Sequence, residues 1–226
     1  MMFKSIKTSV LALLLISTAV YAHAQKKITQ GIITYGVEYD LSTDQKSAID
    51  VSSLPKENKL EFNGNFSKLA MEMGPTILTI IKDGGAENAL LLIDIPMAQK
   101  QIATKMSKED IDKQAGGIKY SDFKATGEKQ VISGYKTEKY TYKDDKGNAY
   151  ELWATKDIEL TPGATNTEFK AIKATPIKFT LSQNSIKTIL TIKSITEQNV
   201  GPFTLTVPGG YDLLTMAELE ALRGGG

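Results

Sequence analysis

Apolar and polar side chains alternate along several short segments of this chain. The pattern is clearest at residues 31–39, where Ile33, Tyr35, Val37 and Tyr39 would share one face of an extended segment. A period of two predicts strands with one buried face and one solvent-exposed face, as antiparallel sheets allow. The same alternation predicts further strands at residues 59–63, 68–73, 186–193 and 203–207.

Glycine-containing turns separate other apolar runs. Residues 82–85 divide the run 77–81 from the run 90–95, and residues 144–148 divide 135–143 from 150–155. Both arrangements predict hairpins, because glycine supplies the positive φ that tight turns require. Residues 98–104 are expected to return beside the strand that Pro96 ends. The chain is therefore predicted to be mostly β with minor α, with about 10–12 antiparallel strands.

Two short helices are predicted from capping patterns at their N-termini. Ser107 to Asp110 forms one pattern, ahead of a helix that would end at Gly116, and Thr215 to Glu218 forms the other. Residues 41–56 and 158–175 show no clear period. Long irregular segments in compact domains are often lids or binding loops, so residues 158–175 or the terminal helix are expected to cover a binding site.

The first 24 residues have the pattern of a cleavable signal peptide. Lys4 and Lys7 precede an apolar run at residues 10–20, and Ala22-His23-Ala24 has the small-x-small form of a cleavage site. Cleavage is expected between Ala24 and Gln25, which leaves residues 25–226 as a single domain in the periplasm or outside the cell. The apolar run is shorter than the roughly 20 residues that span a bilayer, and no later run approaches that length.

Composition excludes several classes of function. Removal of Lys4 and Lys7 from the 27 basic residues leaves 25 against 26 acidic residues, a net charge of −1, and Arg223 is the only arginine. Such a chain lacks the positive field and the guanidinium groups typical of nucleic-acid binding. It has no cysteine, and its only histidine is His23. The mature chain therefore has no Cys–His pair, no Ser-His-Asp arrangement and no ordinary zinc site.

Two candidate chemistries remain after this exclusion. Pairs of carboxylates at residues 109–112 or 144–145 would suffice for a hydrolase, although a helix start and a turn also explain them. Met71 and Met73 would share one face of a strand, but a Cu(I) site normally recruits a thiolate or imidazole as well, so we interpret them as packing residues. No cofactor and no metal are predicted, and we expect a protein that is not an enzyme.

The hairpin at residues 130–158 carries a resemblance to a known family. Gly134-Tyr135, Lys139-Tyr140, Trp153, Thr155 and Asp157-Ile158 resemble the G-Y-x-x-x-K-Y … W-x-T-x-D-I signature of an uncharacterised family of exported bacterial proteins. Residues 203–211 are similar to that family's closing strand and its P-x-G-Y ending. Members often have cysteine where Thr137 stands. The resemblance implies a fold like the periplasmic lipoprotein carrier and receptor group, a curved, incomplete antiparallel β-barrel with covering helices.

Carriers with this fold bind acyl chains or other hydrophobic ligands, so the resemblance implies a soluble cell-envelope protein that binds or shuttles a hydrophobic, lipid-like ligand in a concave β cavity. Two alternatives stay open: a non-catalytic envelope interaction or structural protein with a filled core, which would bind another envelope protein, and a carboxylate-dependent hydrolase. The candidate cavity residues are Leu69, Met71, Met73, Ile80, Leu91, Ile93, Tyr140, Trp153 and Leu190.

Overall fold

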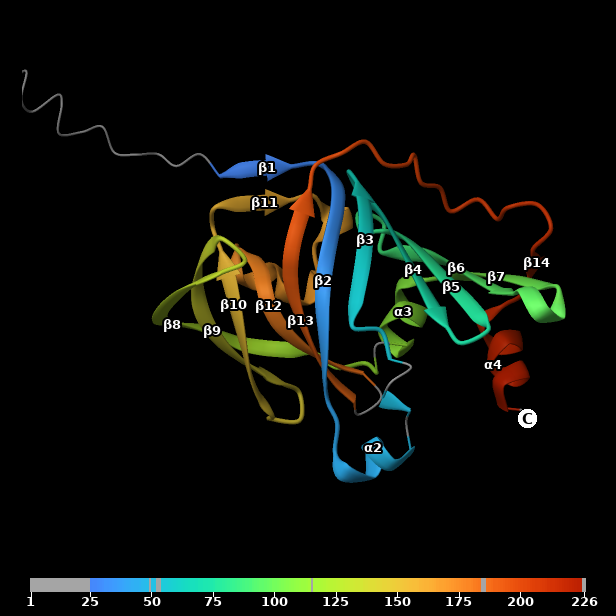
Figure 1. The fold of residues 1–226 in the computed structure, drawn as a ribbon, viewed down its shortest axis with the longest axis horizontal. Helices are drawn as coiled ribbons and strands as arrows, with labels where there is room; N and C mark the ends of the chain where they lie inside the picture. The colour runs from blue at the N-terminus through green and yellow to red at the C-terminus, as the bar shows by residue number, and fades with distance from the viewer. Residues whose placement is uncertain (1–24, 49, 52–53, 115, 184–185, 225–226) are drawn as a thin grey trace, which may run out of the picture.

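The computed structural model describes residues 25–48, 50–51, 54–114, 116–183 and 186–224. Strands dominate these residues and only short helices accompany them, so the predicted mostly-β class is confirmed (Figure 1). The predicted signal peptide, residues 1–24 with the cleavage site after Ala24, lies outside the described residues. Among the described residues, no helix is long and apolar enough to cross a membrane.

The strands follow one another along the chain with few interruptions. They are β1 (Lys26–Ile28), β2 (Gln30–Asp40), β3 (Glu57–Asn63), β4 (Phe66–Met73), β5 (Thr76–Asp83), β6 (Asn88–Ile95), β7 (Lys100–Met106), β8 (Tyr120–Ile132), β9 (Tyr135–Asp144), β10 (Ala149–Thr155), β11 (Ile158–Leu160), β12 (Thr175–Gln183), β13 (Ile186–Thr196) and β14 (Asp212–Leu213). The helical segments are α2 (Thr43–Ala48), η2 (Pro96–Ala98), α3 (Lys108–Gln114), η3 (Pro162–Ala164), η4 (Thr167–Ile172) and α4 (Met216–Gly224). Both predicted hairpins and the strand expected after Pro96 are confirmed as β5–β6, β9–β10 and β7.

Twelve strands form one continuous sheet. Their order is β14-β7-β6-β5-β4-β3-β2-β13-β12-β10-β9-β8, and β1 pairs with β11 in a separate two-stranded sheet. Neighbours in the large sheet are antiparallel, except that the short edge strand β14 runs parallel to β7. Strand β2 pairs with β13, so the first and last long strands of the chain meet in the middle of the sheet.

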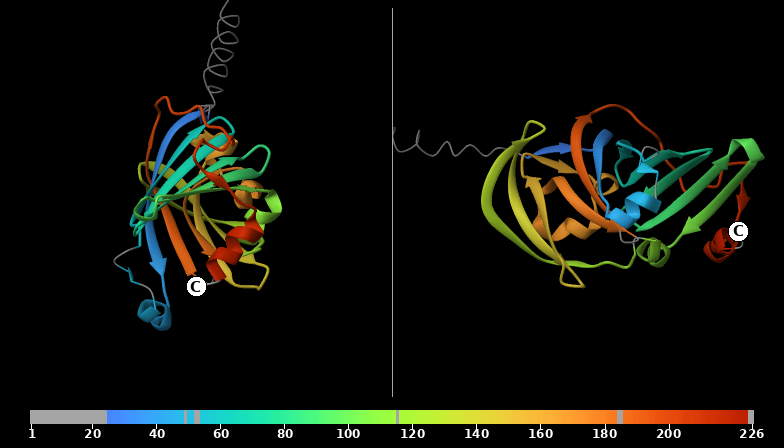
Figure 2. Two further views of the ribbon diagram at one scale, coloured as in Figure 1. Left: turned by 90° about the vertical axis from the view of Figure 1, so that its right-hand side faces the viewer. Right: turned by 60° about the horizontal axis from the view of Figure 1, so that its bottom comes forward.

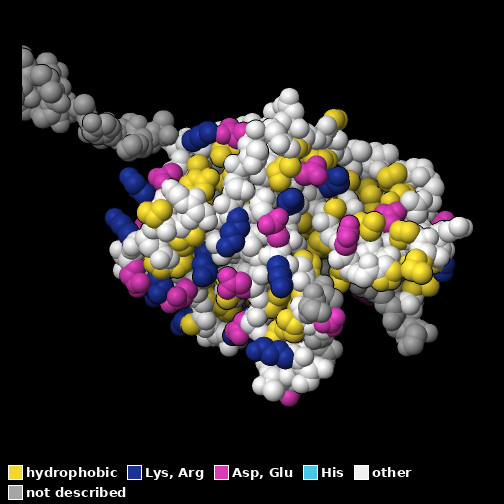
Figure 3. Space-filling model, in the orientation of Figure 1, with side chains coloured by type: hydrophobic (Ala, Val, Ile, Leu, Met, Phe, Trp, Pro, Cys, Tyr) yellow, Lys and Arg dark blue, Asp and Glu magenta, His cyan; other side chains and the backbone are white. Residues whose placement is uncertain are grey.

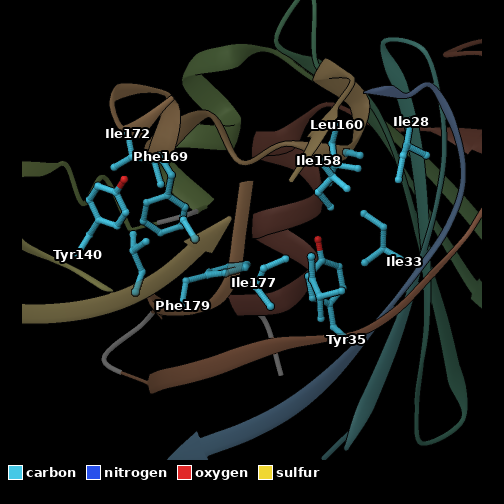
Figure 4. Packing of buried hydrophobic residues seen from close by; sticks show 14 of the residues in the cluster. Ile28, Ile33, Tyr35, Tyr140, Ile158, Leu160, Phe169, Ile172, Ile177 and Phe179 are labelled. Atoms are coloured by element: carbon cyan, nitrogen blue, oxygen red, sulfur yellow. The ribbon is translucent and has the colours of Figure 1, made fainter. Parts of the chain in front are cut away.

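The main core lies on one side of this sheet, which we call the inner face. Ile33 and Tyr35 of β2, Phe62 of β3 and Phe179 of β12 point to this side and are buried. Residues 158–172 cross over them and add buried side chains of their own, which Figure 4 shows facing the sheet residues: Ile158, Leu160, Phe169 and Ile172. The segment expected to be a lid is therefore packed into the core beside β2, β9, β10, β12 and β13.

The pairing between β10 and β12 is short, and we call this short ladder the split between β10 and β12. The two strands pair only where residues 153–155 meet residues 175–178. Two tyrosines satisfy the backbone of β12 beyond this point: the Tyr142 hydroxyl donates to the carbonyl oxygen of Thr180 at 2.7 Å, and the Ser182 amide donates to the Tyr120 hydroxyl at 3.0 Å. Aromatic side chains thus replace the missing strand-to-strand hydrogen bonds.

The predicted strand at residues 203–207 is wrong. These residues are extended but pair with no strand, and instead cross the outer face of the sheet on the way from β13 to β14 (Figure 1). Leu205, Val207 and Tyr211 pack against a second buried cluster formed by Leu90, Leu92 and Ala103. Alternation of apolar and polar residues therefore indicates an extended segment with one side packed against the protein. Such a segment need not form hydrogen bonds with a neighbouring strand. We call residues 200–211 the strap.

Candidate functional site

The register of β3 to β7 assembles two apolar rows on the inner face. The Ile80 row comprises Leu60, Leu69, Ile80, Leu91 and Thr104, which are consecutive cross-strand partners. The Leu78 row comprises Met71, Leu78, Ile93 and Ile102, paired in the same way. The apolar residues at alternating positions of these strands, β-branched isoleucines among them, favour this arrangement. Together we call the side chains of the two rows the apolar inner surface.

On β6, exposure distinguishes this surface from the opposite face of the strand. Leu90 and Leu92 face the strap and are 0% and 6% exposed. Their neighbours Leu91 and Ile93 on the inner face are only partly buried, as are the other members of the two rows apart from Thr104. Met73, beyond the Leu78 row, is 53% exposed. Five adjacent strands, β3 to β7, therefore carry a contiguous apolar area that the protein's own side chains leave partly open.

Two helices flank the apolar inner surface. Figures 1 and 2 show α3 and α4 on the same side of β6 and β7, opposite to the strap. Helix α3 contacts β6 and β7, and α4 contacts β7. Within α4, Leu219 is buried, whereas Leu222 is 64% exposed. The helices therefore border the surface at the β7 side of the sheet without burying it.

A pocket of about 230 Å³ adjoins the apolar inner surface. It lies where the sheet meets α3 and the β8–β12 side of the core. Its lining comes from seven regions of the chain: Ile80, Lys82, Ala89, Met106, Ile111, Gln114, Ile118, Tyr120, Glu168, Leu181 and Ser182. The enclosed volume is below the roughly 300–1,000 Å³ of ordinary small-molecule sites, so a larger ligand would extend from it onto the open rows.

Charged residues surround the mouth of this pocket. A second cavity of about 480 Å³ shares Ile118, Tyr120 and Glu168 with it and is lined by Glu87, Lys108 and Lys170 among others. Glu87 forms ion pairs with both of these lysines. The hydrogen bond from Lys108 is the main reason that the pKa of Glu87 is lowered. The lining of this second cavity contains three lysines and three carboxylates in all, so its formal charges balance.

Other carboxylates with shifted pKa values serve local structure. Ser107 and Thr215 donate their backbone amides and hydroxyls to Asp110 and Glu218 at the starts of α3 and α4, and these bonds lower the pKa of both carboxyls. Both predicted capping patterns are thereby confirmed. Asp144 is buried in the β9–β10 turn; although desolvation raises its pKa, hydrogen bonds from Asn148, Tyr150 and Lys146 lower it overall.

The structure brings together six of the nine predicted cavity residues. Leu69, Ile80 and Leu91 lie in the Ile80 row, Met71 and Ile93 lie in the Leu78 row, and Met73 adjoins it. Three others lie elsewhere. Leu190 faces inward from β13 but packs against the main core, and Tyr140 is buried in that core.

Trp153 lies on the outer face of the sheet. It is the direct cross-strand partner of Lys139 and Lys178, whereas the inward positions of β10 are Leu152 and Ala154. The Lys139 ammonium lies 6.0 Å from the centre of its ring. Trp153 therefore has no contact with the apolar inner surface, because a period of two separates adjacent residues onto opposite faces.

Sequence reasoning missed several residues of the site. Leu78 belongs to a run already predicted as a strand, but its register opposite Met71 and Ile93 could not be specified. Ile102, Met106 and Ile111 come from β7 and the start of α3, where no pattern linked them to β4. Lys82 was interpreted only as part of a turn. Lys82 follows Leu78 and Ile80 at intervals of two residues, and this spacing could have indicated that it faces the same side of the strand.

The described residues contain no cluster of three or more His, Cys, Asp or Glu side chains positioned to hold a metal ion. One buried polar atom lies in the site: the Thr104 hydroxyl, in the Ile80 row, is 0% exposed and makes no hydrogen bond.

Comparison with known proteins gives no match, either among protein-family models or among curated proteins.

Proposed function

We propose that this protein binds a hydrophobic, lipid-like ligand on the apolar inner surface and acts as a soluble carrier in the cell envelope. The observation that carries the proposal is the difference between the two faces of β6. The strap buries Leu90 and Leu92 on one face, while Leu91 and Ile93 on the other remain partly open. Contiguous exposed apolar area of this kind commonly marks a binding surface in a soluble protein.

In this proposal the sheet works as an incomplete barrel with two unequal halves. The half around β2, β9, β10, β12 and β13 is filled by residues 158–172, and it provides rigidity. The half formed by β3–β7 receives the ligand, with α3 and α4 beside it as covers. Figure 3 shows lysines and acidic residues intermingled over the left part of the molecule, and hydrophobic side chains visible on both the left and the right.

The energetics require a preformed surface. An acyl chain of about 14 methylenes gains roughly 11 kcal/mol on complete burial, at about 0.8 kcal/mol each. Association itself costs roughly 4–15 kcal/mol. Reversible binding therefore depends on apolar side chains that are already fixed in place. The ladder pairing of Leu69, Ile80 and Leu91 supplies that condition.

The test is native mass spectrometry of gently purified protein, with Leu91→Lys as the disrupting variant. A lysine at the centre of the Ile80 row places a charge where the hydrocarbon would lie, so co-purifying lipid should disappear. Val131→Lys is the matched control, because Val131 is an exposed residue of β8 outside both rows. Circular dichroism should show that both variants are folded.

Two results would contradict the proposal. One is a wild-type protein that carries no lipid and does not bind added hexadecanoate. The other is equal lipid occupancy in the wild type and Leu91→Lys, which would move the ligand away from the Ile80 row.

A further inference from the structure

Lys82 is the only cationic side chain in the lining of the apolar pocket. It follows Leu78 and Ile80 at the next inward position of β5, and successive inward positions are about 7 Å apart along a strand. Its cross-strand partners are Ser67 and Ala89, which are both buried. The stem of Lys82 is thus held between packed neighbours, and the side chain itself is half-buried. A positive charge therefore stands at one end of the apolar inner surface.

This charge has no counter-ion within the described part of the protein. Lys82 makes no ion pair or hydrogen bond there, in contrast to Lys108 and Lys170, which share Glu87 at the adjoining rim. Glu168 also lines the pocket but forms no ion pair with Lys82. An anion that entered the pocket would supply the partner that the Lys82 ammonium lacks.

A second donor faces the same pocket. The Tyr120 hydroxyl accepts a hydrogen bond from the Ser182 amide, which leaves its own proton available. Both residues line the pocket. Burial raises the pKa of the Tyr120 hydroxyl, so it keeps this proton at neutral pH. An ammonium and a phenol on one small pocket are suited to the oxygens of a carboxylate or phosphate, because hydrogen bonds between charged partners are the strongest that side chains form.

We infer that the ligand is an anionic, single-chain amphiphile whose head group binds Lys82 in the pocket while its tail lies across the Ile80 and Leu78 rows. This inference rests on the proposed function and specifies its ligand class. The pocket volume of about 230 Å³ fits a small head group better than a chain, and the rows beginning at Ile80 provide the adjoining apolar area. Carboxylate and phosphate head groups share the chemistry that Lys82 recognises.

The experiment is a fluorescence titration with cis-parinaric acid and with its methyl ester, which have the same chain but differ in charge. The wild type should bind the acid roughly tenfold to a hundredfold more tightly than the ester. Lys82→Met, which keeps the length of the stem, should abolish that difference by weakening the acid alone, and Lys82→Arg should retain it. Lys105→Met is the matched control, because Lys105 is exposed on the opposite face of β7 and should behave as wild type.

The outcomes separate the two proposals. Binding of neither probe to the wild type would overturn the proposed function and the inference with it. Equal affinities of the wild type for acid and ester, or an equal loss of both in Lys82→Met, would overturn the head-group inference and leave hydrophobic binding in place. Where the acid is preferred, displacement by hexadecanoate compared with hexadecyl phosphate distinguishes the two sources of the anion.

Discussion

The Tyr211 hydroxyl donates to the carboxylate of Asp94, with oxygen–oxygen distances of 2.7 Å and 2.8 Å to its two oxygens. Tyr211 ends the strap, and Asp94 lies near the end of β6 on the outer face. The contact fastens the C-terminal segment to β6 immediately before β14 and α4. It therefore anchors the strap, which covers the outer cluster, at the end that leads to α4.

We expect Tyr211→Phe to lower the free energy of unfolding by about 1–2 kcal/mol, because a hydrogen bond to a charged acceptor is lost at a partly buried site. Urea denaturation measures the change. The double variant with Asp94→Asn should be little worse than either single variant if the two side chains act together. Additive losses would show that each residue stabilises the fold through other contacts.

Alkaline pH should destabilise the protein through its tyrosines. Desolvation by burial, followed by hydrogen bonding to Asp94 or Asp144, raises the pKa of Tyr211 and of Tyr150 to about 12 from the ordinary value of 10. In the interval between these values the unfolded chain has released protons that the folded protein keeps, so unfolding becomes more favourable as pH rises. The contribution of these tyrosines should be constant from pH 8 to about pH 10 and fall progressively towards pH 12.

Urea midpoints measured from pH 8 to pH 12 test this dependence, with tyrosinate absorbance followed in parallel. Tyr211→Phe should show a shallower decline than wild type, since one of the responsible groups is absent. A midpoint that stayed constant across the interval would contradict the expected coupling.

The split between β10 and β12 gives a third prediction. Tyr142→Phe removes the donor to the Thr180 carbonyl at a residue that is 1% exposed, and we expect a loss of about 1–3 kcal/mol from the unsatisfied acceptor. Tyr39→Phe is a matched control: its hydroxyl also donates to a backbone carbonyl, that of Pro55, but the residue is only half-buried. The control should cost less, and equal losses would exclude burial as the cause.

Close backbone contact between η3 and β4 gives a fourth prediction. A Cβ added to Gly163 would lie 2.3 Å from the carbonyl oxygen of Phe66, so Gly163→Ala requires β4 and the η3 turn to separate. We expect destabilisation by roughly 1–3 kcal/mol, measured by thermal unfolding. Gly209→Ala should be neutral, because nothing lies within 4 Å of its added Cβ. Equal melting temperatures for the two variants would show that η3 adjusts freely.

The sequence was informative wherever one face of a strand was buried. Alternation located β2, β4 and β13, and the glycine-containing turns located the β5–β6 and β9–β10 hairpins. It failed for β8, whose 13 residues are almost all exposed, because an edge strand with two polar faces has no period to detect. It also could not distinguish the strap from a strand, since both conformations present alternate side chains to the protein.

The candidate site was predictable in part for the same reason. The sequence analysis identified residues of β4, β5 and β6 that face the inner side, and the register of these strands places them together. Trp153 was grouped with Tyr140 because both belong to the aromatic hairpin. In the structure Leu152 is the cross-strand partner of Tyr140, so Trp153, one residue further along β10, lies on the opposite face. Lys82 was not recognised because the residues of α3 and β12 that line the pocket with it are distant in sequence.

The adjacent residues Leu90 and Leu91 provide a direct comparison of structural and functional burial. Leu90→Ala removes a side chain that is 0% exposed beneath the strap, and such truncations cost about 2–5 kcal/mol. Leu91→Ala changes the same number of atoms on the same strand, but its side chain is partly open on the inner face, so we expect a loss of about 1 kcal/mol or less. Urea denaturation measures both changes.

The affinity for ligand should respond in the opposite order. Leu91→Ala should weaken the binding of hexadecanoate several-fold, and Leu90→Ala should leave that binding unchanged under conditions where the variant is folded. Equal destabilisation by the two substitutions would mean that Leu91 is packed as tightly as Leu90, and the open surface on which binding depends would not exist.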